Sequence, residues 1–225
     1  HEVTRGLDEH QQAARLRGEF IHLQGVIYSV FTKVETTWCG GCRKRILSVN
    51  AACPTCGSVD LIEFTHVIEP FEPGLNWPVI CVADPHPRKD DVFSWFTVAP
   101  SDDVYQIGEL ACSGTYQEIA RAVNDYERPW AGRLVKRLGD PNILTQTDDR
   151  QKRGMTMRQG YDAAGLRFDL ANDEMTSGIR EVREALVPDP RLRKPRLQFF
   201  NTCPRTITAM SRWTWDDWTR AKDKE

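Results

Sequence analysis

The stretch VICVADPHPRKDD, residues 79–91, decides the fold that the sequence predicts. Its first five residues are apolar, and a short apolar run bounded by turn residues is typical of a strand that is buried on both faces. The prolines that follow cannot donate a hydrogen bond to a sheet, so we expect the strand to end at Asp84. The carboxylate of Asp84 would therefore lie at the end of a core strand. It could cap a turn there, or it could be a metal ligand or a catalytic group.

The composition indicates a globular chain whose positive charge is local. The 225 residues are 40% hydrophobic and 28% charged, with a net charge of −2, which allows one large domain with an accessory module or two small domains. No apolar run approaches the roughly 20 residues that span a bilayer, and the sequence shows no signal peptide, so we expect a soluble, intracellular protein. Two basic clusters could follow DNA phosphates or form ordinary solvated surface. These clusters are Arg150, Lys152, Arg153 and Arg158, and Arg191, Arg193, Lys194 and Arg196.

Four of the seven cysteines form two CxxC pairs. Cys39 and Cys42 are followed after ten residues by Cys53 and Cys56. Two such turns can complete a tetrahedral four-thiolate site, which predicts one structural zinc ion. A redox dithiol is the competing interpretation, but it does not explain the second pair. A closed four-thiolate site has no open coordination position, so we expect this zinc module to be structural and not catalytic.

The rest of the chain shows an α/β pattern. Strands are predicted over 92–98 and 104–112, and they should be antiparallel because the turn between them is short. Thr115 and Glu118 form a capping box at the start of a helix, and a strand over 133–138 leads to Asp140 and Pro141. Further helices are predicted over 7–17, 156–164, 176–186 and 204–212, and further strands over 20–31, 64–68, 166–170 and 195–200.

Three antiparallel strands followed by a helix, a strand, and further helices and strands predict a ribonuclease-H-like α/β fold. In this fold a mixed sheet is flanked by helices, and here a small zinc-binding module is inserted. Such a fold would bring together Asp84 and Asp140, each of which ends a strand-like run. Carboxylate sites suit Mg²⁺ or Mn²⁺, and two such ions can support phosphodiester cleavage.

The order of several short segments resembles the large terminase subunits of tailed phages. The resemblance covers most of the chain outside the zinc module, and no part of it explains the four cysteines. The segments that carry it are 15–20, 25–28, 66–71, 83–91, 139–141, 178–183, 195–200, 203–207 and 215–217. It implies a metal-dependent endonuclease that cuts concatemeric phage DNA during packaging, in the cytoplasm of the infected bacterium.

The resemblance also implies which acids hold two catalytic ions, Mg²⁺ or Mn²⁺. Asp84 and Asp140 match the first two acids of the family, Asp90 is an auxiliary candidate, and Glu109 is a further candidate. The third acid of the family lies near the C-terminus, and we expect it beyond Glu225. Asp216 and Asp217 are the alternatives within the sequence. Candidate contacts to DNA phosphates are Lys89, Arg150, Lys152 and Arg153.

The sequence pattern also predicts how the chain is organised, and the resemblance implies its partners. We expect a linker helix and the start of the nuclease over 1–31, the zinc module over 32–65 and the nuclease over 66–225. The sequence contains no GxxxxGK[ST] loop, so we expect no ATP hydrolysis by these residues. Double-stranded DNA is the expected substrate, and the small terminase subunit and the portal are the expected partners of the full-length protein.

Two alternatives remain at this point. The chain could be a non-catalytic zinc-ribbon module that binds nucleic acid or a partner protein, with its acidic residues only turning the chain. It could also be another ribonuclease-H-like nuclease, of the transposase or resolvase type.

Overall fold

The computed structural model describes residues 25–46, 51–144, 147 and 154–215. Its backbone contacts divide the chain into two compact units, residues 1–29 with 209–225, and Val30–Thr208. In the first unit, Val26 forms an isolated antiparallel bridge with Thr214. The strands predicted over 20–31 are wrong for the described part, since residues 25–31 hold this bridge and turns. The helix predicted over 7–17 lies outside the described residues.

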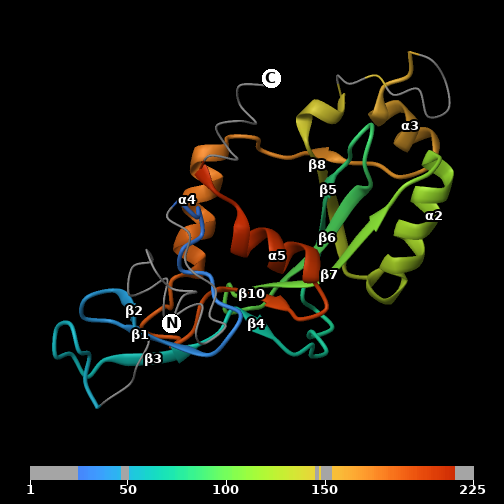
Figure 1. Cartoon of the computed structure of the whole chain (residues 1–225). Helices are drawn as coiled ribbons and strands as arrows, with labels where there is room; N and C mark the ends of the chain where they lie inside the picture. The colour runs from blue at the N-terminus through green and yellow to red at the C-terminus, as the bar shows by residue number, and fades with distance from the viewer. Residues whose placement is uncertain (1–24, 47–50, 145–146, 148–153, 216–225) are drawn as a thin grey trace, which may run out of the picture. The chain divides into compact units, whose positions relative to one another are not determined.

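The second unit contains a seven-stranded mixed sheet (Figure 1). Its strands run in the order β4-β10-β7-β6-β5-β8-β9. β5, β6 and β7 form an antiparallel meander, while β8 lies parallel beside β5 and β10 lies parallel beside β7. The bounds are β4 Val67–Ile68, β5 Val79–Asp84, β6 Asp91–Val98, β7 Val104–Cys112, β8 Leu134–Gly139, β9 Asp169–Leu170 and β10 Leu197–Phe200.

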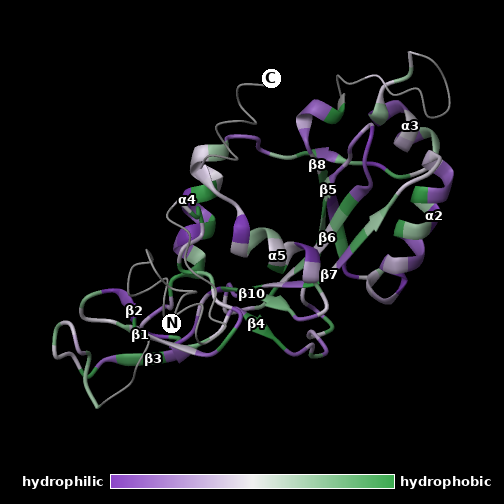
Figure 2. Cartoon of the chain, in the orientation of Figure 1, coloured by the Kyte–Doolittle hydropathy of each residue, from purple (hydrophilic) through white to green (hydrophobic). Residues whose placement is uncertain are grey.

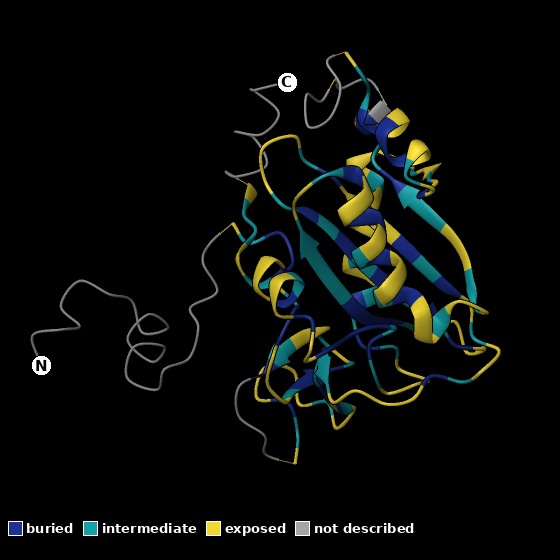
Figure 3. Cartoon of the chain, turned by 90° about the vertical axis from the view of Figure 1, so that its right-hand side faces the viewer, coloured by how far each residue is buried: buried dark blue, intermediate teal, exposed yellow. Residues whose placement is uncertain are grey.

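Successive side chains of a strand point to opposite faces of the sheet. Helices cover the face on which β5 and β6 place their buried apolar side chains. Figure 3 shows α2 (Tyr116–Glu127) lying across one face, with its exposed residues turned outward. The predicted capping box of Thr115 and Glu118 begins this helix. Together with α3 (Met157–Ala163), α2 closes the main hydrophobic core. The remaining helical segments are η1 Arg128–Trp130, η2 Pro141–Leu144, α4 Met175–Leu186 and α5 Pro204–Arg212.

The two faces of β5 differ in burial. Val79, Cys81 and Ala83 are buried on the face that α2 covers, and Figure 2 shows the apolar character of the central strands. Val82 and Asp84 point to the opposite face and are exposed. The predicted strand therefore ends at Asp84, with this carboxylate on the face opposite α2.

The four-cysteine segment forms a small sheet of its own. Three antiparallel strands run in the order β2-β1-β3, with β1 Thr36–Cys39, β2 Lys44–Ile46 and β3 Leu61–Phe64. Three residues after the end of β3, β4 begins at the edge of the main sheet. The prediction of a single strand over 64–68 is therefore wrong. Phe64 ends β3 of the small sheet, and Val67–Ile68 forms β4 of the main sheet.

This mixed sheet, flanked by helices and carrying a small cysteine-containing module, confirms the predicted ribonuclease-H-like fold class. Its central meander, the following helix and the parallel β8 appear in the predicted order. The domain limits at residues 31 and 65 stay predictions. No helix among the described residues is long and apolar enough to cross a membrane.

Candidate functional site

The sheet register places Asp84 and Asp140 side by side. β5 and β8 are parallel neighbours, and Ala83 is the register partner of Gly139. The residue that follows each of these partners is an aspartate, so both carboxylates lie at the same end of the sheet. A site at the carboxyl ends of parallel strands is a frequent position for ligands in α/β proteins.

Local sequence explains why both strands end here. Pro85 follows Asp84 and Pro141 follows Asp140, and proline cannot extend the hydrogen-bond ladder. The Oδ1 atom of Asp140 accepts a hydrogen bond of 2.7 Å from the backbone N–H of Asn142, which stabilises the turn into η2. Asp140 therefore also caps a turn, through one of its two carboxylate oxygens.

The two carboxylates interact electrostatically. The pKa of Asp84 is raised above its usual range, first because neighbouring atoms reduce its hydration and next because the charge of Asp140 opposes its ionisation. The charge of Asp91 acts in the same direction, while His86 and Lys89 oppose it. A pair of carboxylate oxygens with excess negative charge is a donor set that fits a hard divalent cation.

The acids Asp90 and Glu109 contact the start of α5. Glu109 accepts hydrogen bonds from the backbone N–H groups of Arg205 at 2.6 Å and Thr206 at 2.9 Å, and from the Thr206 hydroxyl at 3.0 Å. Asp90 forms an ion pair of 3.4 Å with the Arg205 guanidinium. The structure therefore gives these two acids helix-capping and ion-pairing contacts, and their predicted role as metal ligands stays a prediction.

Asp91 is a buried acid beside the site to which the sequence analysis gave no role. It is fully buried, its Oδ1 accepts from the backbone N–H of His86 at 2.8 Å, and its Oδ2 accepts from the Tyr161 hydroxyl. It thereby holds the loop after Asp84 against α3. A signal was present in the sequence, because Asp91 is in phase with the buried residues Phe93 and Trp95 of the alternating strand.

The other predicted site residues are only partly placed. Lys89 is exposed in the loop between β5 and β6. Within the described ranges, the four cysteines are the one group of three or more possible metal ligands whose donor atoms lie within 4.8 Å of one another. Within the same ranges, Asp84 and Asp140 therefore form no such group with a third acid. Outside the described residues lie Asp216, Asp217, Arg150, Lys152 and Arg153.

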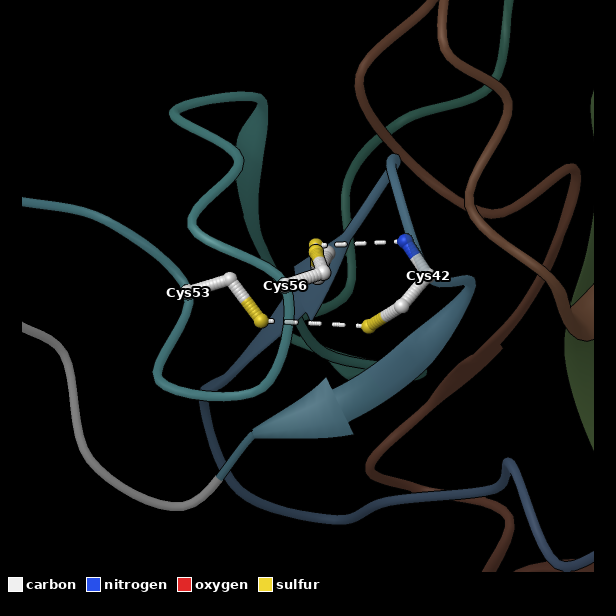
Figure 4. Close-up of side chains that lie close together, drawn as sticks. Cys42, Cys53 and Cys56 are labelled. Atoms are coloured by element: carbon white, nitrogen blue, oxygen red, sulfur yellow. Dashed lines mark hydrogen bonds between the residues drawn. The ribbon is translucent and has the colours of Figure 1, made fainter.

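The four cysteines form a compact cluster, in which Figure 4 labels Cys42, Cys53 and Cys56. The Sγ atoms of Cys39 and Cys56 are 3.5 Å apart, and those of Cys42 and Cys53 are 3.8 Å apart. In a tetrahedral site with Zn–S bonds of about 2.3 Å, neighbouring sulfur atoms are separated by about 3.8 Å. The sulfur arrangement therefore fits one zinc ion.

Tight turns bring these thiols together. At Gly41, a Cβ atom would lie 2.7 Å from the Ser58 Cβ, which favours glycine there. At Gly40 it would lie 1.8 Å from an Asp60 carboxylate oxygen, and that side chain would have to move. The residue after the second cysteine of each pair has a left-handed backbone, with φ of 55° at Arg43 and 72° at Gly57. The two CxxC turns thus have matching backbone geometry.

The thiols differ in their acidity. Desolvation and hydrogen bonding to the other three thiols raise the pKa of Cys42 to about 12. At Cys53 desolvation also acts to raise the pKa, but the backbone N–H groups of Cys56 and Thr55 donate to the thiolate, and the result is a pKa of about 6. Thiolates stabilised in this way are suitable ligands for zinc.

His66 connects the small sheet to the main sheet. Its ring is fully buried, its Nδ1 accepts from the Thr32 N–H at 3.0 Å, and its Nε2 donates to the Leu186 carbonyl at 2.8 Å. The Phe31 and Phe64 rings pack against it. Burial lowers the pKa of His66 to about 4, so the ring is neutral and holds β3, β4 and α4 together.

Comparison with known proteins supports the fold. The sequence matches no protein-family model and no curated protein. Among solved structures, the large terminase of a thermophilic bacteriophage superposes with a TM-score of 0.53 at 15% identity, over 68% of this chain and 36% of that one. A P22 large terminase nuclease domain gives a TM-score of 0.47 at 19% identity, over 64% of this chain and 72% of that one.

The chain thus spans about a third of the length of the thermophilic-phage terminase that it resembles. At 15% identity this likeness concerns the fold. It confirms, at that level, the resemblance to large terminases that the sequence motifs indicated.

Proposed function

We propose that these residues form the metal-dependent nuclease part of a viral DNA-packaging motor of the large-terminase type. Its reaction is the endonucleolytic cutting of concatemeric phage DNA. The observation that carries this proposal is the placement of Asp84 and Asp140 at the carboxyl ends of neighbouring parallel strands. The fold shared with a large terminase adds support.

The acidic pair would hold the catalytic cations. Two divalent ions, Mg²⁺ or Mn²⁺, would supply a water of lowered pKa and stabilise the charge on the departing oxygen. Asp84 is the proposed shared ligand, and Asp140 the proposed ligand of one ion. Their mutual repulsion, which raises the pKa of Asp84, favours cation binding. Asp91 supports the loop that follows Asp84 through the His86 N–H and the Tyr161 hydroxyl.

The remaining residues would bind DNA and partners. Lys89 is exposed in the loop after Asp84 and is a proposed phosphate contact, as are Arg150, Lys152 and Arg153. In the full-length protein we propose the small terminase subunit and the portal as partners, and the host cytoplasm as the place of action. A zinc ion on the four cysteines would stabilise the module without taking part in cleavage.

The test is cleavage of supercoiled plasmid in Mn²⁺ or Mg²⁺ by the chain and by Asp84→Asn and Asp140→Asn. We expect each substitution to lower the cleavage rate by more than the roughly 10–100-fold that loss of an outer-shell partner costs. Asp125→Asn is the matched control, because Asp125 is exposed on α2 across the sheet from Asp84. Cutting by the Asp84 and Asp140 variants at the rate of the unsubstituted chain would exclude the proposed site.

A further inference from the structure

Arg205 is a cation beside the acidic site to which the sequence analysis gave no role. It lies in the first turn of α5, and its side chain is 59% exposed. Its guanidinium contacts the Asp90 carboxylate at 3.4 Å, and Asp90 belongs to the loop that follows Asp84. The charge of Arg205 is therefore directed toward the loop of the proposed catalytic site.

The sheet register places Arg205 on the same face of the sheet as Asp84. Asp84 pairs with Val92, and Val92 pairs with Ala111, so these three side chains share one face. Glu109 is two residues from Ala111 on β7 and lies on that face too, and it accepts the backbone N–H of Arg205. Glu109, which holds the Arg205 backbone, thus lies two strand spacings, roughly 10 Å, to the side of Asp84 and two residues, roughly 7 Å, further along the strand direction.

The backbone around Arg205 is held firmly while its side chain stays accessible. Thr206 donates from its N–H and its hydroxyl to Glu109, and its hydroxyl also accepts from the Gln106 side chain at 2.9 Å. Figure 1 shows the first turn of α5 beside β7. An exposed guanidinium on a fixed backbone is well suited to bind a phosphate with little loss of freedom.

The pairing with Asp90 does not prevent such binding. Both partners are substantially exposed, at 59% and 44% of their side-chain surface, and exposed ion pairs contribute little to stability. A phosphate oxygen can replace the Asp90 carboxylate without leaving a buried charge unpaired. The pair would then serve as the resting state of Arg205.

We propose that Arg205 binds a backbone phosphate of DNA next to the phosphate held at Asp84 and Asp140, and that Asp90 is its partner when DNA is absent. This inference rests on the proposed nuclease function. It assigns Asp90 to the control of a DNA contact and gives the start of α5 a place in the DNA-binding surface.

The test is binding of a fluorescent duplex of about 30 base pairs by the whole zinc-loaded chain without added Mg²⁺ or Mn²⁺, followed by anisotropy between about 50 and 200 mM salt. Arg205→Ala should weaken binding several-fold at low salt and reduce the slope of log K against log salt by about 0.9, the value of one lost phosphate contact. Arg205→Lys should keep most of the slope. Asp90→Asn should tighten binding, since it removes the competing carboxylate.

Arg121→Ala is the matched control, because Arg121 is exposed on α2 across the sheet and should leave the affinity unchanged. Equal affinities of the Arg205→Ala and Arg121→Ala variants would overturn the inference, as would a loss of affinity in Asp90→Asn. If Arg205→Ala fails to fold, the salt slope of Arg205→Lys and the affinity of Asp90→Asn test the role of Arg205 instead. Cleavage by Asp84→Asn at the normal rate would refute the nuclease function separately, whereas the affinities alone decide the role of Arg205.

Discussion

The four-cysteine cluster and the acidic strand ends are both candidate metal sites, but the chain assembles them differently. The cysteines lie between residues 39 and 56, and two short turns bring them together. Asp84 and Asp140 become neighbours only because β8 returns to pair with β5 after two strands and a helix. The first site depends on local spacing and the second on the topology of the whole sheet, so perturbing one should leave the other intact.

The largest effect is expected from loss of metal at the cysteines. Cys39→Ser should lower bound zinc from about one ion per chain to nearly none, and amide exchange in β1–β3 should accelerate roughly a hundredfold or more, because small zinc modules owe their folding to the metal. Elemental analysis and hydrogen exchange measure both effects. Cys112→Ser is the control, since Cys112 lies in β7 of the main sheet. Full zinc occupancy in Cys39→Ser would contradict the four-thiolate site.

The next effect concerns His66, at the junction of the two sheets. The folded chain holds this ring neutral with a pKa of about 4, whereas an unfolded chain protonates it near 6.5. The unfolded state therefore binds more protons between these values. The contribution of His66 to the free energy of unfolding should be constant above about pH 6.5 and fall as the pH drops toward 4, by up to about 3 kcal/mol.

Urea unfolding at several pH values measures this term. His66→Gln should be less stable at neutral pH and should lack this part of the pH dependence. His86→Gln is the control, because His86 lies in the loop after Asp84 and should keep the steep decline. The same pH slope in the wild-type and His66→Gln chains would show that the neutral ring does not stabilise the junction.

A smaller effect is expected at Asp91, the buried acid beside the pair of Asp84 and Asp140. Tyr161→Phe removes the hydroxyl that donates to Asp91, and loss of one partner from a buried carboxylate should cost about 1–3 kcal/mol. Tyr105→Phe is the control, because the Lys194 ammonium that contacts Tyr105 keeps its ion pair with Asp103. Urea denaturation should give the larger loss for Tyr161→Phe. Equal losses in the two variants would contradict a special role of the Asp91 contact.

Features that depend on neighbouring residues could be predicted from the sequence, whereas most contacts between distant residues could not. The CxxC spacing predicted the cysteine cluster, and the apolar run before Asp84 predicted the end of β5, because each depends on a few neighbouring residues. The order of elements predicted the fold class and, through it, the meeting of Asp84 with Asp140.

The contacts of Glu109 and Asp90 with Arg205 could not be predicted in this way. They join residues about a hundred positions apart, and no periodicity specifies which side chain of α5 faces which strand. The division of residues 61–68 between two sheets could not be predicted from the sequence for a similar reason. The apolar pattern continues through His66, and only the buried hydrogen bonds of that ring mark the change of sheet.

The smallest effect has the opposite sign and distinguishes a ligand from a turn cap at Asp84. Since the charge of Asp140 opposes ionisation of Asp84, Asp84→Asn in the zinc-loaded chain without added Mg²⁺ or Mn²⁺ should relieve repulsion and raise the Tm by about 1–2 °C, a shift typical of a few tenths of a kcal/mol in a domain of this size. Asp140→Asn removes the same repulsion but also weakens the Asn142 hydrogen bond, so its gain should be smaller. The double variant should gain less than the sum of the two, because either substitution removes the shared interaction.

Mn²⁺ should then raise the Tm of the wild-type chain and not that of the variants. If Asp84 only caps a turn, Asp84→Asn should instead lower the Tm, and Mn²⁺ should affect all chains alike.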